Sequence, residues 1–448
     1  MPGNIQSCES EGLLVGSSFF VHHKNCDFST RCWDLMTQFL KVKTADEVLA
    51  ILDCVKPLPP EPVSLALACG RRLASDIAAT EPVPHFARAT MDGYAVRARD
   101  TFGASESLPA LLETSGEVVI GEAPGVQAAP GKAVEVPTGG MLPEGADAVV
   151  MVEYTSALDN TTIEVTRPVA PGENVLKAGE DIAPGAALFR KGAMLRPQDV
   201  GVLAALGIVE VEVTRVPRVA LISTGDEIVP VETRPLPPGK VRDINSFSLA
   251  ALIESAGARI GMREMVRDRL EDLVSACSEA ISDHDVIVLS GGSSVGVRDY
   301  TTRVLSGLPE SELLVHGVAI RPGKPTIFGR AGGVLFWGLP GQPVSALITC
   351  QAFVLPSLWK LQGMMETELP PARTLNAILN RQIPSVHGKT DYVPVFLSRR
   401  TVGVPEASPI FGKSGAISIL ARADGYVVIP EHVEGLDPGT EVSVFLFS

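Results

Sequence analysis

Three short, uninterrupted apolar runs between residues 217 and 361 constrain the fold of this chain more than any other feature. Strands without polar alternation are buried on both faces, as in a parallel sheet that helices cover on either side. Such sheets bind their ligands at the carboxyl ends of the strands. The runs lie at 219–223, 285–290 and 334–338, a fourth strand is expected at 259–266, and helices are expected at 246–256, 270–281 and 343–361.

The flanking regions follow another pattern, in which short alternating segments lie between turns rich in Gly and Pro. We therefore predict a multidomain fold of the α/β plus β class: a parallel-sheet α/β domain, an inserted β-rich domain at 81–169 and a C-terminal β-barrel-like domain, with a sandwich as the alternative. Expected strands of the inserted domain lie at 117–120, 133–136, 148–152 and 162–165. Helices are also expected from the capping box at Thr44 to Cys54, at 64–72 and at 197–206.

Charge, cysteine content and hydropathy exclude several classes of function. With 38 basic and 52 acidic residues the net charge is −14, which argues against general binding to nucleic acid or to an anionic membrane. Seven scattered cysteines without a CxxC predict a reduced, cytoplasmic protein. No apolar run reaches the roughly 18 residues of a membrane helix, and no basic segment precedes the apolar run at 12–21, so a secretory signal is not expected.

Residues 1–41 are expected to be a poorly ordered N-terminal extension. His22, His23, Cys26 and Cys32 lie close together there, but their spacing fits no standard zinc pattern. A metal site is therefore the weaker interpretation of this cluster.

The glycine-rich segment after the strand at 285–290 is a candidate anion-binding loop. Backbone N–H groups of such a loop, next to a helix N-terminus, can hold phosphate. The segment matches neither the Walker A pattern nor GxGxxG, so the sequence lacks the signatures of ATP hydrolysis and of dinucleotide binding. A flexible turn is the alternative. The candidate binding residues are Ser290, Gly291, Gly292, Ser294 and Gly296.

Two more strand ends carry groups that suit an oxyanion. In the RPGKP turn at 321–325, Pro and Gly fix the backbone that bears Arg321 and Lys324. A guanidinium beside an ammonium suits a tetrahedral anion, although an exposed basic turn is an equal alternative. Ser345 follows another strand and lies in the first turn of the expected helix at 343–361, where free N–H groups also favour an anion.

Acidic residues at the same edge would project into the expected ligand crevice. Asp226 and Glu227 follow the strand at 219–223, and Asp299 follows the glycine-rich segment. In the β-rich region, Asp92 and Thr138 lie in turn-rich motifs whose distance from the sheet edge the sequence does not determine. Ordinary Asx or Gly-Asp turns are the alternative for these acids.

In order along the chain, the motifs resemble those of the molybdopterin molybdenumtransferase family, which includes MoeA and the E-domain of gephyrin. The resemblance covers residues 42–448. It rests on MDGYAV (91–96), PTGGMLPEGADAVVMVE (137–153), AGEDI (178–182), STGDE (223–227), GGSSVGVRDY (291–300), RPGKP (321–325) and GLPGQPVSA (338–346), with GKSG (412–415) and ADG (423–425) near the C-terminus. At single positions the chain departs from the family pattern, with Gly317 and Arg321 where lysine is frequent, and Gln342 where asparagine is frequent.

The resemblance implies a homodimer with four parts per subunit: a discontinuous linker and dimerisation domain (42–80 and 170–215), the β-rich domain (81–169), a molybdopterin-binding α/β domain (216–362) and a C-terminal β-domain (363–448). It implies an active cleft between the α/β domain of one subunit and the β-rich domain of the other. The implied substrates are adenylylated molybdopterin and molybdate, with Mg²⁺ as cofactor and the molybdopterin adenylyltransferase as a candidate partner.

The resemblance also implies roles for individual residues. Mg²⁺ would be held by Asp226, Glu227, Asp268 and Asp299, and the catalytic residues would be Asp92, Thr138, Glu227, Asp268 and Asp299. Arg321, Lys324 and Ser345 would hold oxyanion oxygens, while the loop from Ser290 to Gly296 would receive the pterin or its phosphate. A non-catalytic scaffold, a molybdopterin adenylyltransferase and a tungstate-inserting variant are the alternatives.

Overall fold

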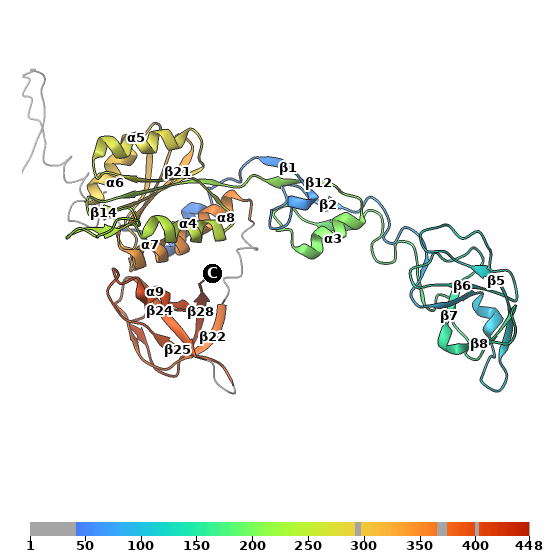
Figure 1. Cartoon of the computed structure of the whole chain (residues 1–448). Coiled ribbons are helices and arrows are strands. Elements are labelled where there is room, and N and C mark those ends of the chain that lie inside the picture. The colour runs from blue at the N-terminus through green and yellow to red at the C-terminus, as the bar shows by residue number, and fades with distance from the viewer. Residues whose placement is uncertain (1–41, 292–296, 365–373, 399–402, 448) are drawn as a thin grey trace, which may run out of the picture. The chain divides into compact units, whose positions relative to one another are not determined.

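The computed structural model describes residues 42–291, 297–364, 374–398 and 403–447, and of residues 297–299 it describes the backbone only. The extension predicted at 1–41, with its histidines and cysteines, lies outside these ranges. The described chain forms three six-stranded sheets and five two-stranded pairs (Figure 1).

The first six-stranded sheet, the α/β sheet, contains four parallel strands in the order β16-β13-β17-β21, with β16 at one edge. The three apolar runs of the sequence form β13, β17 and β21, whose residues are buried without alternation, whereas the edge strand β16 is largely exposed. The strands are β13 (Arg218–Thr224), β16 (Arg259–Val266), β17 (Val286–Gly291) and β21 (Val334–Pro340).

Helices cover both faces of this sheet, as Figure 1 shows. Along β13, Val219 and Leu221 join one apolar core and Ala220 and Ile222 join the other, because successive strand residues point to opposite faces. The first core also contains residues of α4 (Asn245–Ser255), α7 (Pro343–Thr349) and α8 (Leu355–Leu361), and the second contains residues of α5 (Leu270–Ile281) and α6 (Val297–Ser306).

The sheet is not wholly parallel, which corrects the sequence prediction. β18 (Glu312–His316) and β20 (Ile327–Ala331) extend it beyond β21 as antiparallel strands. The turn between β20 and β21 is the pair Gly332 and Gly333, with φ of +55° and +84°, a conformation that two-residue hairpins need and that glycine adopts without strain. β18 was missed because it is short and only partly buried.

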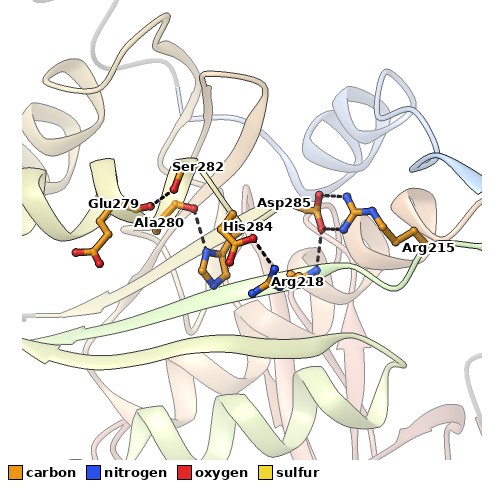
Figure 2. A network of polar contacts seen from close by, with 8 residues as sticks. Arg215, Arg218, Glu279, Ala280, Ser282, His284 and Asp285 are labelled. Carbon is orange, nitrogen blue, oxygen red and sulfur yellow. Dashed lines mark hydrogen bonds and ion pairs between the residues drawn. The ribbon is translucent and has the colours of Figure 1, made fainter. Parts of the chain in front are cut away.

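A polar network ties together the amino ends of β13 and β17 (Figure 2). Asp285 accepts two hydrogen bonds from the Arg215 guanidinium, at 2.6 and 3.1 Å, and one from the backbone N–H of Arg218 at 2.8 Å. Both carboxylate oxygens are thus engaged. The hydrogen bonds to Asp285 also raise the pKa of the Arg215 guanidinium. This network lies at the end of the sheet opposite to the predicted ligand edge.

The helix predicted at 343–361 is present, with a π-helical segment Cys350–Val354 between α7 and α8. Among the described residues, this stretch is the helix whose length and apolar composition, with a mean hydropathy of 1.4, would suffice to cross a membrane. No membrane-crossing segment is expected from the sequence. Because 67% of this stretch is buried against the sheet, it is a core helix of the α/β fold.

The second six-stranded sheet is β-rich and has the order β7-β4-β6-β5-β9-β8. Its pairs are antiparallel except for β5 with β6. The strand expected at 117–120 is wrong: β5 ends at Glu117, and Val119 and Ile120 are exposed. The strands are β4 (Gly93–Val96), β5 (Ala110–Glu117), β6 (Lys132–Val136), β7 (Ala148–Met151), β8 (Thr155–Ala157) and β9 (Thr162–Val165).

Three short pairs join segments that flank the β-rich sheet in sequence: β1 (Pro60–Ser64) with β12 (Glu210–Thr214), β2 (Ile77–Ala78) with β11 (Ala187–Phe189), and β3 (Arg88–Ala89) with β10 (Val175–Leu176). Helix α2 (Ala45–Leu52) begins at the predicted Thr44 capping box, and α3 (Pro197–Ala205) is also as expected. The helix predicted at 64–72 is wrong, because the Leu65 N–H bonds to the Val209 carbonyl and only a 3₁₀ turn, Leu65–Leu67, follows β1.

The third sheet closes on itself as a five-stranded barrel, since β24 pairs with both β25 and β26. A sixth strand, β19 (Ile320–Arg321), comes from the RPGKP region and pairs in parallel with β24. The barrel strands are β22 (Thr374–Leu379), β24 (Thr390–Ser398), β25 (Glu406–Pro409), β26 (Gly425–Ile429) and β28 (Glu441–Leu446). The predicted fold class, α/β plus β with a C-terminal barrel, is therefore confirmed.

Candidate active site

The register of the α/β sheet aligns three of the predicted motifs. Thr224 at the end of β13 pairs with Gly291 at the end of β17, and Gly291 pairs with Pro340 at the end of β21. The STGDE, GGSSVG and GLPGQPVSA motifs therefore leave the sheet side by side at its carboxyl edge. This is the edge at which open α/β sheets bind ligands.

Asn245, which the sequence analysis missed, joins two of these motifs. Its side-chain Nδ2 donates to the Ser290 hydroxyl at 2.8 Å and to the Gly341 carbonyl at 2.9 Å. Ser290 is buried, so this predicted binding residue is also part of the packing between β17 and α4. Asp243, another buried side chain, accepts from the Ser246 N–H and the Ser223 hydroxyl, both at 3.1 Å, and fixes the start of α4.

Gly291 is needed for packing at the sheet edge. A Cβ atom there would lie 1.9 Å from Thr224 Cγ2 and 3.0 Å from the Thr224 carbonyl oxygen. The neighbouring strand thus leaves no room for a side chain. Of the other predicted residues of this loop, Gly292, Ser294 and Gly296 lie outside the described residues, and Asp299 lies on α6 where only the backbone is described.

Three predicted acids interact electrostatically at this edge. Burial raises the pKa of the partly buried Asp268 carboxyl, and repulsion from the charges of Asp226 and Glu227 raises the same pKa further. Asp226 and Glu227 are exposed. In the described ranges, no three acidic, histidine or cysteine side chains are gathered closely enough to ligate a metal by themselves. Asp268 nevertheless lies close enough to Asp226 and Glu227 to be repelled by their charges.

The two cations of the RPGKP turn have different surroundings. The Arg321 guanidinium contacts the carboxylate of Asp391, while Lys324 is exposed. The turn that separates them is fixed: the Thr326 hydroxyl donates to the Gly323 carbonyl at 2.7 Å, and a Cβ on Gly323 would lie 2.5 Å from Thr349 Oγ1. The backbone between the two cations is therefore packed closely against Thr349 of α7.

The GLPGQPVSA motif, which contains Ser345, contacts the segment of the C-terminal domain around Ser414. Ser345 is buried in the first turn of α7. The N–H of Val344 in the same turn donates to the Ser414 carbonyl at 3.1 Å, and the Ser414 hydroxyl contacts the Gln342 side chain. The GKSG motif thus caps the helix start that the sequence analysis proposed as an anion site.

In the β-rich sheet the structure brings Asp92 and Thr138 together across 46 residues. The Thr138 N–H and hydroxyl donate to Asp92 Oδ1 at 2.7 and 2.8 Å, and these two bonds lower the pKa of Asp92. Gly93 is required beside them, because a Cβ there would lie 1.9 Å from the Val150 carbonyl oxygen. Asp92 also lines a cavity of about 280 Å³ with Glu117 and other residues of the sheet.

Comparison with known proteins connects these motifs to one family. Residues 42–207 match the MoeA N-terminal region (domains I and II), residues 220–360 match the "Probable molybdopterin binding domain", and residues 376–447 match the MoeA C-terminal region (domain IV). The molybdopterin molybdenumtransferase of Bacillus subtilis (strain 168) is 33% identical over 388 residues, which cover 86% of this chain and 89% of that protein. The chain belongs to the MoeA family.

Other MoeA-family proteins agree. The molybdopterin molybdenumtransferase of Haemophilus influenzae is 34% identical over 394 residues, or 88% of this chain and 95% of that protein. A crystal structure of a molybdopterin biosynthesis MoeA protein from Pyrococcus horikoshii OT3 superposes with a TM-score of 0.77 at 34% identity, covering 91% of this chain and all of the other. The resemblance inferred from the motifs is therefore confirmed.

Proposed function

We propose that this MoeA-family transferase of molybdenum cofactor biosynthesis binds adenylylated molybdopterin and molybdate, hydrolyses the phosphoanhydride bond and releases AMP as molybdenum enters the dithiolene. The observation that carries the proposal is the set of neighbouring carboxylates at the sheet edge. There, burial and the charges of Asp226 and Glu227 raise the pKa of Asp268. A cation that arrives with the substrate relieves this repulsion, so the site is matched to a metal–phosphate complex.

Mg²⁺ fits the donor set. Its ligands in proteins are oxygens, commonly one or two carboxylates completed by waters and substrate phosphates. Asp226, Glu227, Asp268 and Asp299 would hold it. Bound there, Mg²⁺ supplies charge neutralisation to the phosphoanhydride. Of the catalytic carboxylates Glu227, Asp268 and Asp299, those that do not ligate Mg²⁺ would orient the attacking water.

The remaining predicted residues bind the two substrates. Arg321, Lys324 and the Ser345 region hold molybdate oxygens, because guanidinium and ammonium groups suit a dianion. The segment from Ser290 to Gly296, which includes Gly291, Gly292 and Ser294, receives the pterin or its phosphate. Asn245 supports this segment through its hydrogen bond to Ser290.

We extend the proposal to the assembly. Each chain has four parts, and the chain acts as a homodimer. The parts are the linker domain (42–80 with 170–215), the β-rich domain (81–169), the α/β domain (216–362) and the C-terminal domain (363–448). Asp92 and Thr138 complete the cleft of the second copy. Their hydrogen bonds keep Asp92 ionised, which suits a group that faces a metal or a substrate donor. Cytoplasmic localisation and contact with the molybdopterin adenylyltransferase belong to the same proposal.

The test is direct. Purified protein is incubated with adenylylated molybdopterin, Mg²⁺ and either molybdate or tungstate, and AMP and metal-bound pterin are measured. We expect AMP release that depends on the oxyanion and on Mg²⁺. Asp299→Ala on α6 should abolish it, whereas Glu279→Ala, at an exposed position near the C-terminal end of α5, should not. An intact nucleotide with both oxyanions would contradict the proposal, and consumption of ATP instead would indicate an adenylyltransferase.

A further inference from the structure

We infer that Asp391, in the C-terminal barrel, is a positioning residue for molybdate binding, because it holds the Arg321 guanidinium at the anion site. The inference rests on the proposed role of Arg321 as an oxyanion ligand. It assigns the barrel a part in the reaction, since Asp391 lies on β24, a barrel strand.

The backbone places the two residues opposite each other. β19 adds to β24 in parallel, with Ile320 opposite Thr390 and Arg321 opposite Asp391. The Thr390 N–H donates to the Ala319 carbonyl at 2.9 Å. A residue of the RPGKP turn is thus locked in register with the barrel, 70 residues later in the chain.

The burial of the two side chains is unequal. The Asp391 side chain is 1% exposed, while the Arg321 side chain is 50% exposed. Arg321 contacts Asp391 through one terminal nitrogen, Nη2, which also donates to the Pro384 carbonyl at 3.3 Å. The guanidinium is therefore fixed at one corner, and half of the side chain faces solvent, where an oxyanion can approach.

In the part of the chain that the structure describes, Asp391 lacks a hydrogen-bond partner at one oxygen, which is unusual for an acid with a purely structural role. Its Oδ2 accepts from Arg321 and from the Ser385 hydroxyl at 2.7 Å, but its Oδ1 is buried without a hydrogen-bond partner among the described residues. By contrast, the structural Asp285 receives bonds at both oxygens. A buried carboxylate with an unpartnered oxygen lowers the stability of the fold, so its presence here calls for another reason. Orientation of Arg321 supplies one.

Positioning of Arg321 and electrostatic repulsion by Asp391 predict opposite effects of Asp391 on molybdate affinity. The negative charge of Asp391 weakens the attraction of Arg321 for an anion, so its neutralisation alone would tighten molybdate binding. A fixed guanidinium, however, binds without first losing its rotational freedom, and misplacement of a binding group by about 1 Å can cost on the order of a hundredfold in rate. We take positioning to dominate, because Arg321 is held at two points, by the register of its backbone with β24 and by the contact of its Nη2 with Asp391.

The experiment compares Asp391→Asn, Arg321→Ala, the double variant and Asp285→Asn in the full-length protein. The half-saturating molybdate concentration is measured for AMP release, and the affinity for molybdate alone is measured by calorimetry. We expect Asp391→Asn to weaken molybdate binding roughly twofold to tenfold, the cost of ordering one side chain on binding, and to leave the KM for adenylylated molybdopterin unchanged. The double variant should match Arg321→Ala, and Asp285→Asn should lose stability while its molybdate dependence stays normal.

Tighter molybdate binding by Asp391→Asn, or equal losses for both substrates, would overturn the inference. If Asp391→Asn does not fold, the double variant decides, because removal of both partners leaves no unpaired buried charge. A double variant that binds molybdate more weakly than Arg321→Ala would contradict action through Arg321. Wild-type protein that binds molybdate but releases no AMP refutes the proposed function alone, whereas protein that does neither refutes both.

Discussion

The contact between Gly291 and Thr224 gives a quantitative test of the sheet edge. In Gly291→Ala the new methyl would lie 1.9 Å from Thr224 Cγ2, far inside van der Waals contact. Both residues end central strands whose backbones are paired on either side, so relaxation is limited. Overpacking of this kind costs about 1–3 kcal/mol, and we expect the upper end. Because a domain of this size loses roughly 2–4 °C per kcal/mol, scanning calorimetry should record a fall of several degrees.

Thr224→Ser is the matched rescue, since it removes Cγ2 and keeps the hydroxyl. Combined with Gly291→Ala it should recover about 2 kcal/mol, which is within the range of coupling between contacting residues. Gly201→Ala is the control, because that glycine lies within α3 with nothing within 4 Å of a Cβ, and it should gain up to about 1 kcal/mol. Absence of rescue by Thr224→Ser, or full stability of Gly291→Ala with lost pterin binding, would refute the packing explanation.

Three further outcomes follow from local geometry. Gly317→Lys, which introduces the lysine frequent in the family, should cost about 1–2 kcal/mol in denaturant unfolding, because residue 317 has a φ of +90°. Burial and repulsion raise the pKa of Asp268 above 3.8, so the folded state loses stability as the carboxyl ionises. Without Mg²⁺, the melting temperature of Asp268→Asn should therefore exceed that of wild type once the pH rises above 3.8. Equal melting temperatures at neutral pH would contradict this. Thr138→Val should raise the pKa of Asp92 partway toward 3.8, measured by NMR titration, because the backbone N–H bond of residue 138 remains.

The central layers of the α/β domain could be predicted because burial on both faces leaves a local signal. The runs that became β13, β17 and β21 are apolar at nearly every position, and the helices at 270–281 and 343–361 have clear ends. The antiparallel β18 gave no such signal, since it is half-exposed. The segment at 64–72 has helical spacing, but pairing of the preceding β1 with β12 far along the chain determines its structure.

The site residues divide in the same way. Motifs at strand ends could be placed on one edge from the sequence, since parallel strands end together. Asn245 was missed because an asparagine at the start of a helix has no distinctive pattern, and its function depends on Ser290, 45 residues away. The contact of Asp92 with Thr138 likewise spans 46 residues and depends on the pairing of β4 with β6.

Asp391 shows why the barrel could not be linked to the anion site from sequence. The residue lies in a strand whose neighbours Tyr392 and Val395 are buried, and an aspartate beside them reads as an edge position or a turn. Its depth becomes evident only when β19 is seen to add to β24 and to bring Arg321 alongside. A carboxylate that is buried with one oxygen unpartnered has a cost in folding, and the exposed half of its arginine partner faces solvent. Such an arrangement is explained when the solvent-facing group binds a ligand, which is why we expect the barrel to influence oxyanion affinity and not stability alone.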